Sequence, residues 1–119
     1  MPEGRLYRSM LLDFYGELLT ERQKECYDLH YNDDLSLSEI AEQCGISRQG
    51  VWDNIRRASS AMEEIEEKTG LIRRFTEVDA GLHRVLELLE TLDGSAAEQQ
   101  QEGIGIITQE VRGLLRLRE

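Results

Sequence analysis

Residues 36–57 decide the fold of this chain, and they read SLSEIAEQCGISRQGVWDNIRR. The opening SLSE has the form of a capping box, in which a serine hydroxyl and a glutamate three residues later bind backbone N–H groups at the start of a helix. Gly45 is placed to end that short helix, because glycine adopts a left-handed backbone without strain. Ser47 is suited to cap a second helix. The stretch therefore predicts two helices joined by a tight turn.

Apolar residues in this stretch fall where two such helices would touch. Ile40 and Ala41 are expected to face inward from the first helix, and Ala41 is small enough for the helices to cross closely. Ile46 fills the corner, while Val51 and Ile55 anchor the second helix. Together these positions predict a helix-turn-helix.

The rest of the chain carries further helical signals and no competing strand pattern. Thr20 begins a second capping box, and Asn32-Asp33-Asp34 is a turn cluster. Residues 99–105 are polar and contain two glycines, so the sequence leaves their structure open. The fold is predicted to be all-α. The expected helices cover residues 5–19, 21–31, 36–44, 48–68, 71–92 and 104–114.

Beyond Gly70 the apolar residues alternate at intervals of four and three, the heptad pattern of a helix that packs along a partner helix. This seam consists of Leu71, Phe75, Val78, Leu82, Val85, Leu89 and Leu92. We interpret residues 1–70 as a helix-turn-helix domain and residues 71–119 as a helical extension for dimerisation or packing. We expect a homodimer through the seam, with Leu82 and Leu89 at its centre. The alternative is that the seam closes within one chain.

Composition excludes several classes of protein. The 119 residues include 14 Lys and Arg against 24 Asp and Glu, a net charge of −10 that opposes strong nonspecific binding to a polyanion.

The chain has no apolar run of membrane-spanning length and no signal-peptide pattern, so we expect a cytoplasmic protein. Cys26 and Cys44 are expected to be buried thiols. His30 and His83 are isolated in the sequence, so we expect no metal site and no cofactor.

Longer stretches resemble known proteins. Residues 18–58 are similar to region 4 of sigma factors of the sigma-70 type. Residues 12–75 resemble the YlxM family of small helix-turn-helix proteins more closely, through FYGELLTERQ, LSLSEIAEQ, SRQGVWDNIRR and MEEIEEKTGLIRRF in this order. This resemblance implies DNA binding and an association with the signal recognition particle pathway, as a regulator or accessory factor.

Carried over from the resemblance, the groove-facing side of the second motif helix presents Arg48, Gln49, Trp52, Asp53 and Arg56. Arg pairs in bidentate fashion with guanine and Gln with adenine, which suits Arg48 and Gln49 to base edges. Arg57 and Lys68 are expected to contact phosphates. The alternative is that these arginines are solvated residues that balance nearby acids. For Trp52 three roles stand: a protein contact, base stacking, or packing on the first helix.

Four acids crowd the far end of the same helix, at Glu63, Glu64, Glu66 and Glu67. They are expected to form either an acidic surface for a basic partner or a solvated helix exterior.

Two functions compete. The first is a DNA-binding regulator, with RNA as a second possible ligand. The second is a protein-interaction module that uses the same fold to bind a component of the signal recognition particle. Enzymatic activity has little support, because the sequence has no phosphate loop, no metal cluster and no nucleophile beside a base.

Overall fold

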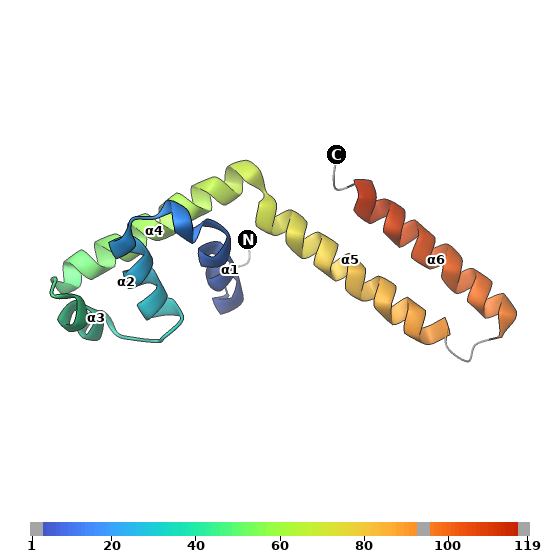
Figure 1. Cartoon of the computed structure of the whole chain (residues 1–119), viewed down its shortest axis with the longest axis horizontal. Helices are drawn as coiled ribbons and strands as arrows, with labels where there is room; N and C mark the ends of the chain where they lie inside the picture. The colour runs from blue at the N-terminus through green and yellow to red at the C-terminus, as the bar shows by residue number, and fades with distance from the viewer. Residues whose placement is uncertain (1–3, 93–95, 117–119) are drawn as a thin grey trace. The chain divides into compact units, whose positions relative to one another are not determined.

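The structure is a computed structural model that describes residues 4–92 and 96–116. These residues form an all-α fold, as predicted, and contain no strand (Figure 1). The elements are α1 (Arg5–Tyr15), the short 3-10 helix η1 (Gly16–Leu18), α2 (Glu21–Tyr31), α3 (Leu37–Cys44), α4 (Arg48–Thr69), α5 (Leu71–Leu92) and α6 (Ala97–Arg116).

The helix boundaries follow the predicted capping signals. The side chains of Thr20 and Ser36 each accept a hydrogen bond from the backbone N–H three residues later, at 3.2 and 3.1 Å, and both capping boxes are complete. Gly45 and Gly70 end α3 and α4 with φ of 69° and 64°. These positive φ values favour glycine, so the two predicted helix ends are confirmed.

The last helix is longer than expected. It begins at Ala97 and continues without a break through residues 99–105, whose structure the sequence leaves open. Gly103 lies within this helix, directly against the side chain of Leu92. Its lack of a side chain lets the neighbouring helix come close, and this packing outweighs the low helix propensity of glycine. The sequence Ser95-Ala96-Ala97-Glu98 also has the form of a capping box, but Ser95 lies outside the described residues.

The chain divides into two compact units, with the boundary between Ile72 and Arg73. In the first unit α4 packs against α1, α2 and α3. The core consists of Tyr7, Leu11, Leu12, Tyr15, Cys26, Tyr27, Ile40, Val51, Ile55, Ala58, Met62 and Ile72. The predicted anchors Val51 and Ile55 are therefore buried, and the apolar face of α4 continues through Ala58 to Met62, whereas Ile65 is only half-buried.

The acidic cluster at the end of α4 does not form one outer surface. Glu66 is 7% exposed and accepts hydrogen bonds from the Tyr15 hydroxyl at 2.7 Å and the Ile72 N–H at 2.9 Å. Glu63 accepts from the Tyr7 hydroxyl at 3.2 Å, and burial together with this carboxylate raises the pKa of Tyr7 to about 12. Both surface interpretations are wrong for Glu66, because the Tyr15 hydroxyl and the Ile72 N–H supply donors that make its burial possible.

The two cysteines differ in burial. Cys26 is fully buried in α2, and burial raises the pKa of its thiol. Cys44 is only half-buried at the end of α3, where its thiol donates to a carboxylate oxygen of Glu25 at 3.5 Å. The expectation of two buried thiols therefore holds for Cys26 alone.

In the second unit, α5 and α6 form an antiparallel hairpin. A Cβ atom on Gly81 would collide with Leu114, and one on Gly103 would collide with Leu92. The first contact joins the middle of α5 to the end of α6, and the second joins the end of α5 to the first turns of α6, which fixes the antiparallel direction. Arg84 also donates from its Nε to Glu110 at 3.0 Å.

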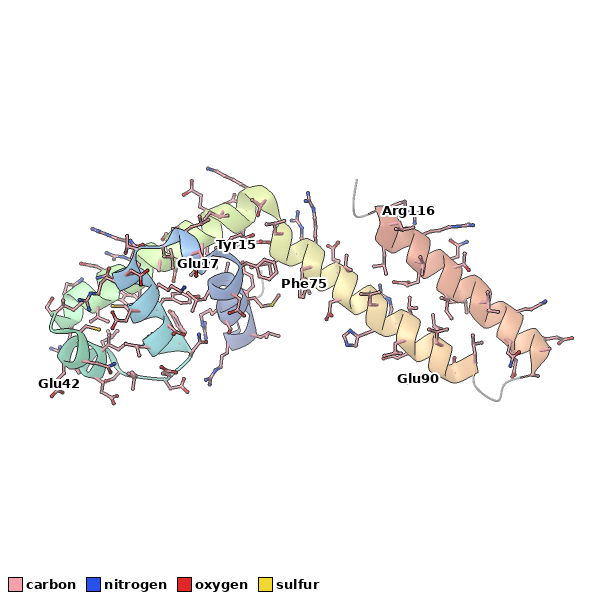
Figure 2. All side chains as sticks on the ribbon, viewed as in Figure 1. Tyr15, Glu17, Glu42, Phe75, Glu90 and Arg116 are labelled. Carbon is pink, nitrogen blue, oxygen red and sulfur yellow. The ribbon has the colours of Figure 1, made fainter. Side chains whose placement is uncertain are left out.

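The seven residues of the predicted seam differ in burial. Val78, Val85 and Leu92 are half-buried on the face of α5 that also carries Gly81. The other members are exposed: Leu71 by 46%, Phe75 by 53%, Leu82 by 56% and Leu89 by 52%. Within α6 no described side chain is fully buried. The side chains of both helices are drawn in Figure 2.

Candidate nucleic-acid interface

The predicted helix-turn-helix is formed by α3, a turn at residues 45–47, and α4. The N–H groups of Gly45 and Ile46 both donate to the Ala41 carbonyl, at 2.9 and 3.2 Å, and this closes the turn. Ser47 then caps α4 by accepting from the Gly50 N–H at 3.0 Å. The turn brings the N-terminal ends of α3 and α4 to one surface.

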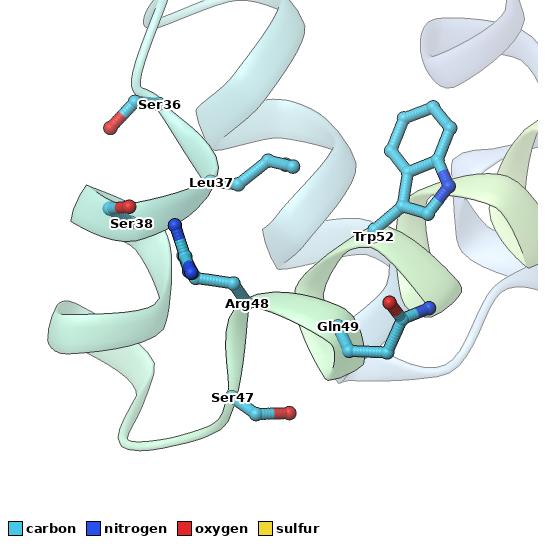
Figure 3. A pocket seen from close by; sticks show the side chains of 7 residues that line it. All are labelled: Ser36, Leu37, Ser38, Ser47, Arg48, Gln49 and Trp52. Carbon is cyan, nitrogen blue, oxygen red and sulfur yellow. The ribbon is translucent and has the colours of Figure 1, made fainter.

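A shallow depression of about 690 Å³ lies at this surface. Three predicted reading residues, Arg48, Gln49 and Trp52, line it from α4. The opposite side comes from the start of α3 and from the turn, through Ser36, Leu37, Ser38 and Ser47 (Figure 3). The base-reading residues predicted from the sequence do not include any residue of this second side. The paired capping signals at Ser36 and Ser47 could have indicated it, since each marks a helix N-terminus.

Helix N-termini attract anions, because their first N–H groups have no partner within the helix and carry the positive end of the helix dipole. In α3 the Ser36 hydroxyl satisfies only one of these groups. Glu39 partly opposes the attraction. Its carboxylate accepts from the Ser36 N–H at 3.0 Å, and this hydrogen bond holds the pKa of Glu39 below its ordinary value.

The predicted reading residues differ in their local bonding. Asp53 accepts from the Gln49 amide at 3.1 Å and from the Arg56 guanidinium at 2.9 Å, so it connects two of them. Arg48 is exposed and makes no ion pair with any described residue. Arg57 is also exposed, on another side of α4 and away from the depression.

Trp52 is 39% exposed and lies in the depression, outside the core (Figure 3). Its indole is therefore available to a ligand. The exposed part of the indole can take part in a protein contact or in base stacking.

Charge within the motif differs from charge in the whole chain. Residues 36–57 contain three acids, Glu39, Glu42 and Asp53, and three arginines, at positions 48, 56 and 57. Their formal charges cancel, so the net −10 of the chain arises entirely outside this motif. An anionic ligand at the motif therefore meets less local repulsion than the net charge of the whole chain suggests.

Among the described residues, no group of three or more His, Cys, Asp or Glu side chains is arranged to hold a metal ion. No helix in the described part of the chain combines the length and apolar character needed to cross a membrane.

Comparison with known proteins identifies the family. Residues 2–103 match the model of the family described as "Putative helix-turn-helix protein, YlxM / p13 like". A UPF0122 protein of Acetivibrio thermocellus is 50% identical over 84 residues, which cover 71% of this chain and 69% of that protein. UPF0122 proteins of Desulforamulus reducens and Geobacillus kaustophilus are each 42% identical, over 83% and 82% of this chain and 86% and 89% of their own. This chain, with its helix-turn-helix formed by α3 and α4, therefore belongs to the UPF0122 family of YlxM-like helix-turn-helix proteins.

Proposed function

We propose that this protein is a cytosolic regulator that binds duplex DNA through the depression between α3 and α4. The observation that carries the proposal is the meeting of two capped helix N-termini with Arg48, Gln49 and Trp52 on one surface. A helix-turn-helix places the start of its second helix in the major groove. The first N–H groups of α3 then lie where they can bind a backbone phosphate.

Arg48 is the principal base-reading residue in this proposal. It is exposed at the first turn of α4 and is not engaged by an acid, so its guanidinium can pair with guanine without breaking an ion pair. Gln49 and Arg56 must first give up or share their bonds to Asp53. We therefore assign Gln49 and Arg56 weaker and more context-dependent contacts, and we assign Arg57 a phosphate contact.

The test begins with selection of preferred sequences from a random DNA pool, followed by titration against a labelled preferred duplex. We expect Arg48→Ala to cost about 1–3 kcal/mol and to relax the preference at one base pair. Arg57→Ala should weaken all sequences alike. Lys68→Ala is the matched control. Lys68 lies at the far end of α4, away from the depression, and pairs with Glu64 at 3.0 Å, so against its expected phosphate contact the variant should change neither affinity nor preference. An equal loss on every sequence for Arg48→Ala would contradict base reading by this residue.

A second candidate is a protein-interaction module that docks on a component of the signal recognition particle, the pathway implied by the resemblance to YlxM proteins. The observation that favours it is Asp53 in the middle of the reading face, next to an exposed Trp52. An acid at this position repels phosphate but suits a basic protein surface. Both candidates are binding functions, and we assign no catalytic role.

Salt dependence separates the two candidates. A DNA complex that neutralises several phosphates loses affinity steeply and linearly on a log scale as salt rises. A complex built around Trp52 and apolar contacts changes far less. For DNA, we also expect no measurable retention of nonspecific duplex at physiological salt, because the chain carries a net charge of −10.

A further inference from the structure

The α5–α6 hairpin exposes apolar side chains that its own two helices do not cover. On α5 these are Leu82, Leu86 and Leu89, each between 52% and 56% exposed. On α6 they include Ile104, Val111 and Leu115, between 40% and 55% exposed. Their spacing of three, four and seven residues places each set on one side of its helix.

The two exposed sets lie on the same side of the hairpin. At about 100° per residue, the exposed set of α5 is rotated by about a quarter-turn from the half-buried set that faces α6. The exposed set of α6 is rotated from its own inward set by about the same angle and in the same sense. In two antiparallel helices, equal rotations of this kind point to one side of the pair. The hairpin therefore presents a single apolar face, defined by these six residues.

In the register of this hairpin, the apolar face is complementary in shape to the same face of a second copy. Along an antiparallel helix pair, the numbers of two residues at the same level always have the same sum. The contacts Gly81–Leu114 and Gly103–Leu92 share one sum, so they belong to a single register. In that register Leu115, Val111 and Ile104 lie level with residues 80, 84 and 91 of α5. Leu82, Leu86 and Leu89 occupy levels between these. A second hairpin laid face to face, with its α6 on this α5, would therefore interleave its apolar side chains with those of the first.

Charges along the edges favour the same arrangement. Asp79 lies on the edge of α5 beyond the apolar face, where it pairs with His83 at 3.6 Å. Arg112 and Arg116 lie on the corresponding edge of α6, level with residues 83 and 79 of α5 in this register. Placing α5 on the partner's α6 brings the acidic edge beside the basic edge. Placing α5 on the partner's α5 would instead bring acid beside acid. Pairing α5 with α6 also makes every neighbouring helix pair antiparallel, as in up-and-down four-helix bundles.

We infer that the apolar face binds a second copy of this chain and forms an antiparallel four-helix bundle, with α5 of one copy on α6 of the other. The bundle pairs two helix-turn-helix units. This inference therefore rests on the proposed function and extends it, because a symmetric dimer can bind the two half-sites of a DNA sequence. Its test uses oligomeric state without DNA, so its failure is distinct from failure of DNA binding.

The first experiment is sedimentation equilibrium of the full chain across micromolar concentrations. We expect a species of twice 13.7 kDa that dissociates on dilution. Leu86→Lys buries an unpaired charge in the face and should weaken dimerisation at least about tenfold. Ile106→Lys is the matched control, because Ile106 is 50% exposed but lies on the other side of α6. A monomer at about a hundred micromolar, or equal loss in both variants, would overturn the inference.

The second experiment tests the arrangement with exposed residues whose replacement spares the fold. Asp79→Arg and Arg112→Asp should each weaken the dimer, because each places like charges on facing edges. The double variant restores opposite charges and should regain most of the lost affinity. Circular dichroism checks that each variant keeps its helices. Failure of the double variant to recover would overturn the placement of α5 on the partner's α6.

Discussion

The two units of this chain have similar amphipathic helices but bury them to different extents. The first unit has a core of twelve hydrophobic residues, to which α1, α2, α3 and α4 all contribute. The second unit has only two helices, and no described side chain of α6 is fully buried. A two-helix layer can cover one stripe of each helix and leaves the other stripe in water. The comparison shows that the number of surrounding helices, rather than periodicity, decides burial.

The largest expected effect compares one core position with one hairpin position. Ile55 is 1% exposed, so Ile55→Ala should lower the free energy of unfolding by about 2–5 kcal/mol. Leu82 is 56% exposed, so Leu82→Ala should cost less than about 1 kcal/mol at concentrations where the chain is monomeric. Urea unfolding followed by the fluorescence of Trp52, the single tryptophan, reports the first unit, and far-UV circular dichroism reports both. Equal losses would contradict the contrast between the units.

A smaller effect tests the buried acid that helps to hold the first unit together. Glu66→Ala leaves the Tyr15 hydroxyl and the Ile72 N–H without this acceptor, which should cost about 1–3 kcal/mol. Glu64→Ala is the control, because Glu64 is exposed and pairs only with Lys68 at the surface, so its loss should stay within about 0.5 kcal/mol. Thermal unfolding measures both. Similar effects would show that Glu66 is solvated in solution.

Two glycines of α6 test the packing of the hairpin. Gly105→Ala should stabilise the helix by up to about 1 kcal/mol, because a Cβ there meets open space. Gly103→Ala should gain less or lose stability, since its Cβ would collide with Leu92. Thermal unfolding by circular dichroism compares the two variants. Equal stabilisation would mean that α5 and α6 do not pack in this register.

The smallest effect concerns pH at the start of α3. The pKa of Glu39 is lowered from its ordinary 4.5 by its hydrogen bond to the Ser36 N–H. A carboxyl whose pKa is lower in the folded state contributes stability above its unfolded pKa, and loses it as pH falls through the folded pKa. Glu39→Gln should therefore be slightly less stable than the natural chain at neutral pH, and the difference should vanish under acid conditions. A difference independent of pH would contradict the charge-based cap.

The helix-turn-helix could be predicted from the sequence almost to the residue, because its signals are local. A capping serine binds N–H groups three residues away, and a glycine stop depends on the backbone of one residue, so Ser36, Gly45 and Gly70 specify their helix ends without distant contacts. The candidate reading residues Arg48, Gln49 and Trp52 follow from that motif. The Ser36 side of the depression does not follow from the motif, because it depends on how α3 and α4 pack against each other.

Tertiary structure alone decided which amphipathic positions became buried. Glu66 is buried because Tyr15, fifty-one residues earlier, donates to it, and no local pattern indicates this pairing. The seam of α5 was predicted as one series, yet Val85 lies toward α6 while Leu82 is exposed. The spacing of apolar residues determines which side chains share a face of the helix. It does not determine which of these faces a neighbouring helix covers. The covered face depends on the direction of approach, and in the hairpin this was set by Gly81 and Gly103, where the missing side chains let the opposite helix come close.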